Sequence, residues 1–285
     1  VVVVLEADVP WTTPNSAPPS DARIIGIGED PLFSTYPVRG FHVDSNLAGS
    51  PRLTLQALVG AVKDIGVDAS AVQARKERWS AGSQARRQAA QKRAEDGKNE
   101  TPINKAWFTS CLAEILGENT VLLNELGVDV SQIEFNHPGT FFGTPPSAAL
   151  GWALGASLGA KLAAPDKTVV CCVGDGSYIF GSGTATHIVS QSQNLPVLNI
   201  VWNNGIWNAV QNSTKVLYAD GIAVRNNDFA VSTLDQSFHY EMICQAAGGY
   251  AERVEDPAEV PAAIQRALHA VNVEKRQALL NIIGQ

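Results

Sequence analysis

An aspartate between two glycines stands directly after a strongly apolar run, in the stretch VVCCVGDGS that contains Asp175. A second apolar run, LPVLNIVW, is followed by Asn203 and Asn204. If the two runs are neighbouring parallel strands, their carboxyl ends lie side by side, and the Asp175 carboxylate and an asparagine amide oxygen reach one small volume. Mg²⁺ prefers oxygen ligands and is usually bound by one or two carboxylates together with phosphate oxygens. The pattern therefore predicts a magnesium site that binds a phosphorylated ligand.

The residues around the aspartate also suit an anion. Gly174 and Gly176 let backbone N–H groups approach a phosphate closely, and a helix that begins near Ser177 directs its positive end towards that phosphate. An ordinary turn is the alternative interpretation, because Asp-Gly is among the most common turn dipeptides. The position of both polar clusters at the ends of successive strands favours a binding site.

Residues 101–285 contain the elements that must position these side chains. Short apolar runs typical of buried strands alternate with helical stretches such as 147–164 and 256–271. The predicted strands lie at 119–124, 167–173, 195–202, 248–254 and 277–283. This alternation predicts an α/β fold with a doubly wound, mostly parallel sheet that carries helices on both faces.

The first hundred residues differ in character. Residues 1–62 hold two apolar runs, VVVVLEADV and ARIIGIG, and a helical stretch that opens with Ser-Pro, which together predict the end of an α/β domain. Residues 63–100 are charged and mostly basic, and we interpret them as a solvated linker rather than a patch for an anionic partner. The GIGED stretch at 26–30 allows a further interpretation, a nucleotide-binding protein, but it has no third glycine. The predicted domains are therefore 1–62, 63–100 and 101–285.

Composition argues against several classes of protein. The chain has 285 residues and a formal net charge of −7, which argues against a nucleic-acid partner. No apolar run approaches the length of a membrane-spanning helix, and no secretory signal is evident. Cys171 and Cys172 are adjacent in a predicted strand, so their side chains point to opposite faces and cannot both bind one metal ion. With Cys111 and Cys244 they are interpreted as reduced thiols of a cytoplasmic protein.

The spacing of the two polar clusters resembles a known signature. Gly-Asp-Gly-Ser, followed by Asn204 at 29 residues after Asp175, resembles the motif of thiamine-diphosphate-dependent enzymes of the acetolactate synthase-like group, with its benzoylformate and oxalyl-CoA decarboxylase-like members. The resemblance implies that Asp175 and Asn204 bind Mg²⁺ through their side chains and Ile206 through its backbone carbonyl. The residues that it places against the diphosphate of thiamine diphosphate (ThDP) are Gly174, Gly176 and Ser177.

The resemblance extends to other parts of the chain. The stretch AALGWALGASLGAKLAAP resembles the helix that follows the pyrimidine contact of the cofactor. This implies that Leu150 bends the cofactor as an apolar wedge and that backbone groups of Ala148 and Leu150 bind the aminopyrimidine. Asn124 and Glu125, in NEL, resemble an Asn-Glu-Gly turn that approaches the diphosphate. Residues 1–62 resemble the second half of the family's central, Rossmann-like domain.

The resemblance implies a lyase or transferase that decarboxylates or ligates a 2-keto acid through an enamine on ThDP. In this family the glutamate that activates the cofactor lies on an N-terminal pyrimidine-binding domain, and no residue here matches it. Because the chain starts inside an apparent strand, we expect a C-terminal portion that is inactive alone and is completed by the missing N-terminal half or by a partner chain. A homodimer or homotetramer is expected. The alternative is a non-catalytic or regulatory subunit with the same fold.

Three histidines and one tryptophan receive mainly structural interpretations. His187 lies in a predicted helix and is expected to have a structural role, whereas His239 precedes a helix and is interpreted as a surface or capping residue. His137 stands beside a Pro-Gly turn and is considered for the pocket, although a structural role is the more common one. Trp152, in an Ala/Gly-rich helix, is expected at a dimer interface.

Overall fold

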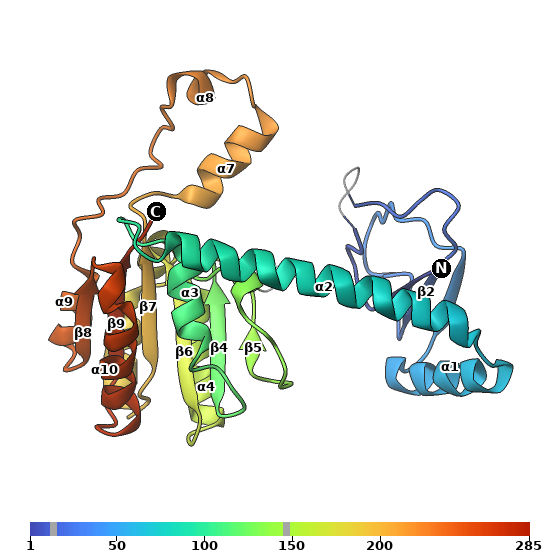
Figure 1. The fold of residues 1–285 in the computed structure, drawn as a ribbon, viewed down its shortest axis with the longest axis horizontal. Coiled ribbons are helices and arrows are strands. Elements are labelled where there is room, and N and C mark those ends of the chain that lie inside the picture. Colours follow the sequence, from blue (N-terminus) through green and yellow to red (C-terminus); the bar gives the residue numbers. More distant parts are fainter. Residues whose placement is uncertain (12–15, 145–148) are drawn as a thin grey trace. The chain divides into compact units, whose positions relative to one another are not determined.

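The computed structural model describes residues 1–11, 16–144 and 149–285. The chain forms two compact units, Val1–Ala81 and Gly82–Gln285. Helix α2 (Ala69–Gly97) contains the boundary between them and covers most of the stretch predicted as a charged linker (Figure 1). The predicted domain boundaries at residues 62 and 100 stay predictions.

The first unit contains a three-stranded parallel sheet. Its strands are β1 (Val2–Leu5), β2 (Ile24–Gly28) and β3 (Ser45–Ala48), in the order β1-β2-β3. Helix α1 (Pro51–Ile65) begins at the proline of the Ser-Pro pair, as predicted. Strand β3 was not predicted, because its sequence SNLA is short and lacks an apolar run.

The second unit is built on a six-stranded sheet in which every neighbouring pair is parallel. The strands are β4 (Thr120–Glu125), β5 (Phe141–Phe142), β6 (Thr168–Gly174), β7 (Leu198–Asn203), β8 (Tyr250–Val254) and β9 (Ala278–Ile283), in the order β5-β4-β6-β7-β9-β8. The predicted α/β fold with a parallel sheet is thus confirmed. All five predicted strands are present, whereas the two-residue β5 is too short for a sequence pattern to indicate.

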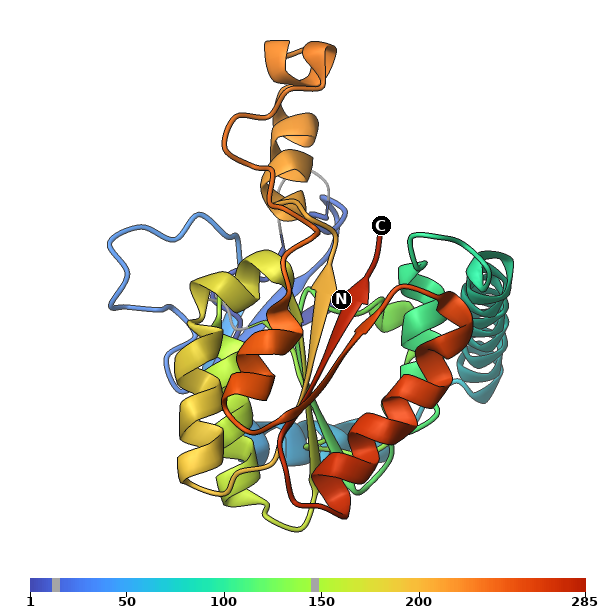
Figure 2. The same cartoon turned by 90° about the vertical axis from the view of Figure 1, so that its left-hand side faces the viewer.

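Helices cover both faces of this sheet (Figure 2). Helices α3 (Lys105–Ala113) and α10 (Val260–Asn272) pack on one face, and α4 (Trp152–Ala163), α6 (Gly183–Ser192) and α9 (Tyr240–Ala246) on the other. Cys172 belongs to the core under the first pair and Cys171 to the core on the opposite face, as predicted from their adjacency in a strand. All four cysteines are buried and free.

The remaining helices lie beyond the carboxyl edge of the sheet. Helix α5 (Asp175–Phe180) follows β6 directly, and α7 (Asn208–Leu217) and α8 (Ile222–Asn226) form an arm that projects from the end of β7 (Figures 1 and 2). Two short 3₁₀ helices occur at Val130–Gln132 and Pro257–Glu259. Among the described residues, no helix combines the length and apolar character needed to cross a lipid bilayer.

A buried polar network connects α5 and α6 with the start of β9. Gln277 Nε2 donates to the backbone carbonyls of His187 (2.9 Å) and Ala247 (3.2 Å), so its Oε1 faces His187 Nδ1 at 2.6 Å as an acceptor. His187 Nδ1 therefore carries the proton, and Nε2 accepts from the Tyr178 hydroxyl at 2.9 Å. His187 is fully buried, which supports the structural role predicted for it.

This network gives the unfolding free energy a defined pH dependence. Burial lowers the pKa of His187 below its ordinary value of 6.5, while the hydrogen bond to Gln277 acts in the opposite direction. The folded protein therefore binds the proton less readily than the unfolded chain, and stability falls as the pH drops below 6.5. We expect urea unfolding of the native protein to show this loss between about pH 7.5 and about pH 5.5, and His187→Gln to show less of it. An equal loss in both proteins would contradict the assignment.

Candidate functional site

The carboxyl ends of β6 and β7 lie side by side, as predicted. Gly174, the last residue of β6, pairs with Trp202 near the end of β7. The next residue, Asp175, accepts hydrogen bonds from the backbone N–H of Gly176 at Oδ1 (2.8 Å) and from that of Gly205 at Oδ2 (2.7 Å). The aspartate thus holds the first turn of α5 and the turn after β7 together.

The Asp175 carboxylate is almost completely buried, with 2% of the residue exposed. Burial raises the pKa of Asp175 above its ordinary value, while the backbone N–H groups of Gly176 and Gly205 lower it. An ionised carboxylate at this depth is costly unless a positive charge lies nearby. The site is therefore electrostatically suited to a cation.

A cavity of about 280 Å³ opens next to this carboxylate. Seven of the residues predicted for the site line it: Leu150, Gly174, Asp175, Gly176, Ser177, Asn204 and Ile206. Asn204 Oδ1 accepts only a long hydrogen bond, 3.3 Å from the Ile206 backbone N–H. Little hydrogen-bond energy is therefore lost if this amide oxygen turns towards a ligand. The structure thus brings most of the predicted set into one hollow.

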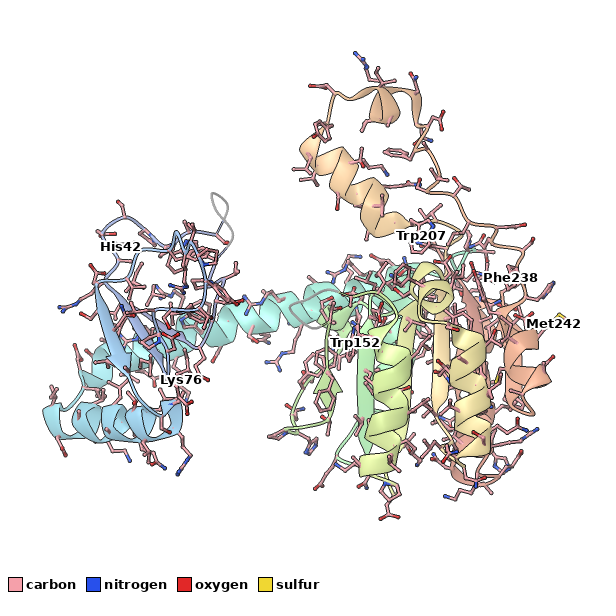
Figure 3. All side chains as sticks on the ribbon, turned by 180° about the vertical axis from the view of Figure 1, so that it is seen from behind. His42, Lys76, Trp152, Trp207, Phe238 and Met242 are labelled. Carbon is pink, nitrogen blue, oxygen red and sulfur yellow. The ribbon has the colours of Figure 1, made fainter. Side chains whose placement is uncertain are left out.

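Trp207 closes one side of the hollow. The indole lies where the arm that carries α7 joins the carboxyl edge of the sheet (Figure 3), and it packs on the backbone of Gly176. A Cβ added at Gly176 would lie 2.6 Å from two carbons of the Trp207 ring. Glycine is therefore required here for close packing, in addition to any role in approaching an anion.

Two predicted site residues do not line the cavity. Asn124 Oδ1 accepts from the backbone N–H groups of Gly127 (3.0 Å) and Val128 (3.1 Å), which shapes the turn after β4. Glu125 accepts from the N–H groups of Gly151 (2.6 Å) and Ala153 (3.0 Å) at the start of α4. Both side chains are thus engaged in local structure, and their contact with a cofactor stays a prediction. Ala148 lies outside the described residues.

Three other sequence-based interpretations concern side chains away from the cavity lining. His239 occupies the N-cap position of α9, but its side chain makes no capping hydrogen bond and instead pairs with Glu241 at 2.5 Å. The backbone carbonyl of His137 accepts from the Thr140 hydroxyl within the Pro-Gly turn. Trp152 packs against the core on the α4 face, and its place in a dimer interface stays a prediction.

The sequence reasoning missed Lys105. It is the first residue of α3, and it lines the same cavity as Gly174 at the end of β6. The order of elements could have indicated this position. Helix α3 is followed by β4 after a short loop, so the end of α3 lies near the start of β4 and the start of α3 lies near the edge where β4 ends. Any long side chain at that position reaches the same edge.

The donor set fits a hard cation that keeps other ligands. Among the described residues, no cluster of three or more His, Cys, Asp or Glu could hold a metal ion on its own. One buried carboxylate, a neighbouring amide oxygen and backbone groups remain, which is how Mg²⁺ is held when phosphate oxygens complete its octahedron. A hollow bordered by glycines and the start of a helix leaves room for that phosphate.

Comparison with known proteins gives a consistent picture. Residues 126–282, more than half of the chain, match the family model described as "Thiamine pyrophosphate enzyme, C-terminal TPP binding domain". A probable acetolactate synthase of Mycobacterium bovis is 32% identical over 130 residues, which cover 46% of this chain and 22% of that protein. A benzoylformate decarboxylase of Pseudomonas aeruginosa is 35% identical over 101 residues, 34% of this chain and 19% of that protein. The matched parts thus span about a fifth of these relatives.

The fold has a counterpart among solved structures. A thiamine diphosphate-dependent 4-hydroxybenzoylformate decarboxylase of Rhodococcus jostii RHA1 superposes with a TM-score of 0.55 at 21% sequence identity. The superposition covers 64% of this chain and 33% of that one. At this level of identity the likeness concerns the fold.

Proposed function

Because the chain belongs to the thiamine pyrophosphate enzymes, through their C-terminal TPP-binding domain, we propose that its cavity binds ThDP together with Mg²⁺. The observation that carries this proposal is the buried Asp175 carboxylate beside Asn204 in a hollow at the carboxyl ends of β6 and β7. Asp175, Asn204 and the Ile206 carbonyl would hold the ion. The backbone groups of Gly174, Gly176 and Ser177 would bind the diphosphate.

The reaction proposed is decarboxylation or ligation of a 2-keto acid. Bound ThDP supplies an electron sink for breaking a carbon–carbon bond next to a carbonyl. The chain contributes binding and orientation: Asp175 holds two turns of backbone around the metal position, and Leu150 lines the hollow as an apolar wall. The names of the related acetolactate synthase and benzoylformate decarboxylase support a 2-keto acid as substrate.

We further propose that the glutamate that activates the cofactor comes from a pyrimidine-binding domain outside these 285 residues. Glu125 is buried and directly precedes Leu126 of the cavity wall. Its carboxylate already accepts hydrogen bonds from two backbone N–H groups, so it is not available as that base. The domain would belong to a longer form of the chain or to a partner. In a longer form of the chain, the complete site would form in a homodimer or homotetramer.

Measurements of cofactor binding and of turnover distinguish this function from a non-catalytic or regulatory subunit. The protein is titrated calorimetrically with ThDP, once with Mg²⁺ and once with a chelator. Mg²⁺-dependent binding is the expected result, and no binding, or equal binding under chelation, would contradict the proposal. Release of CO₂ from aliphatic and aromatic 2-keto acids is then measured with and without the pyrimidine-binding domain. Tight binding without turnover in the completed assembly would identify a non-catalytic subunit.

A further inference from the structure

Lys105 places a positive charge at the wall of the cavity. Its Nζ donates to the backbone carbonyl of Leu126 at 3.1 Å and lies 4.9 Å from the ring centroid of Trp202. Both Leu126 and Trp202 line the same hollow as Asp175. Among the described residues, no carboxylate forms an ion pair with this ammonium group. The charge is thus held by a carbonyl dipole and an aromatic face rather than by an ion pair with a described residue.

This arrangement is unfavourable for the protein alone. Lys105 is the first residue of α3, where the helix dipole favours negative rather than positive charge. Asn104 caps the same helix end by accepting from the N–H of Ala106 at 2.8 Å, so the lysine is not needed there. Burial lowers the pKa of Lys105, and only the fields of Asp129 and Asp175 oppose this effect. A residue that breaks a local rule in this way commonly serves a bound ligand.

The charge balance of the cavity indicates which ligand. A diphosphate and the Asp175 carboxylate together carry more negative charge than one Mg²⁺ neutralises, so the filled site needs a further cation. We propose that Lys105 binds the oxygens of the diphosphate directly and provides that charge. The inference rests on the proposed function, since it assigns one more ligand to the same cofactor. The Lys105 ammonium group has three N–H donors, so it can bind the phosphate either in place of the Leu126 carbonyl or in addition to it.

A purely structural lysine is the competing explanation. In that case the bond to Leu126 stabilises the turn after β4, and its loss weakens every ligand of the cavity alike. A diphosphate ligand instead predicts selectivity: phosphate-bearing ligands lose affinity, and thiamine, which has the same ring system without phosphate, does not.

The test uses four proteins: the native chain, Lys105→Met, Lys105→Arg and the control Lys167→Met. Lys167 also donates to a backbone carbonyl, that of Glu118, but it precedes β6 and so lies at the opposite end of that strand. Dissociation constants are measured by calorimetry for ThDP, thiamine and inorganic pyrophosphate, each with Mg²⁺. For Lys105→Met we expect about tenfold weaker binding of ThDP and pyrophosphate, the loss typical of one charge-assisted hydrogen bond. Thiamine binding is unchanged, Lys105→Arg recovers most of the affinity, and Lys167→Met behaves as native.

The outcomes distinguish this inference from the proposed function. Native affinity of Lys105→Met for pyrophosphate and ThDP, or an equal loss for thiamine, would overturn the role of Lys105 and leave the proposed function intact. If the native chain binds pyrophosphate but not ThDP, the cofactor assignment fails while the role of Lys105 is still decided by pyrophosphate. Binding of neither ligand overturns both.

Discussion

Replacing Asp175 with asparagine is expected to abolish Mg²⁺-dependent binding of ThDP. The substitution removes the buried carboxylate found among the described lining residues, and with it the negative charge that attracts the cation. Loss of outer partners of a metal site alone lowers affinity about 10- to 100-fold, so loss of the principal ligand is expected to cost at least about 100-fold. Asparagine keeps the size of the side chain, so the packing around α5 is preserved.

The same variant is expected to change the stability of the ligand-free protein only slightly. Burial raises the pKa of Asp175, so the ionised group costs stability at neutral pH, and asparagine removes this cost. Asparagine also loses one of the two acceptors that serve Gly176 and Gly205, and the two effects oppose each other.

Thermal unfolding separates binding from folding in this experiment. Saturation at about 100 times the Kd stabilises a protein by about 2.7 kcal/mol, and this gain should appear in the native chain and vanish in Asp175→Asn. Asp166→Asn is the control, because Asp166 is an exposed aspartate before β6 rather than after it. If the Asp175 variant keeps the full stabilisation by ThDP and Mg²⁺, the metal assignment is wrong.

Much of the fold follows from apolar runs because parallel sheets are buried on both faces. β4, β6, β7 and β9 are buried along almost their whole length, so each appears in the sequence as a mostly apolar segment. β7 and β9 are each interrupted by one buried asparagine, Asn199 and Asn281. The juxtaposition of Asp175 and Asn204 then needs only that β6 and β7 be neighbours, which short crossovers favour. Strands β3 and β5 lack such runs and depend on tertiary pairing.

The sequence did not predict the direction in which the side chains at the end of β4 point. Glu125 is the last residue of β4 and pairs with Val173, whose side chain belongs to the core beneath α4. The preceding Asn124 pairs with Cys172, which faces the other layer. Because alternate residues face opposite sides, a shift of one position exchanges these two environments. Only the observed register shows that Glu125 points to the start of α4 rather than into the cavity.

Replacing Glu125 with alanine is therefore expected to destabilise the fold strongly and to lower the affinity of the cavity for ThDP indirectly. Glu125 is 1% exposed, and it accepts from the backbone N–H groups of Gly151 and Ala153. Gly151 has a φ of +82° and packs closely on the backbone of Gly181 at the end of α5, so the carboxylate fixes the contact between α4 and α5. Loss of two charge-assisted hydrogen bonds that leaves buried amides without partners should lower the unfolding free energy by about 3 to 5 kcal/mol.

Two further variants show whether the carboxylate itself is responsible. Glu125→Gln keeps one acceptor oxygen and should lose about half as much unfolding free energy in urea, whereas Glu118→Ala, at an exposed position before β4, should stay within about 0.5 kcal/mol of the native protein. Because Leu150 precedes Gly151 in the chain and lines the cavity, ThDP affinity should fall in the same order as stability. Weak ThDP binding at native stability would instead favour direct contact of Glu125 with the cofactor. If Glu125 acts only by holding α4, its replacement must lower the unfolding free energy whenever it lowers the ThDP affinity.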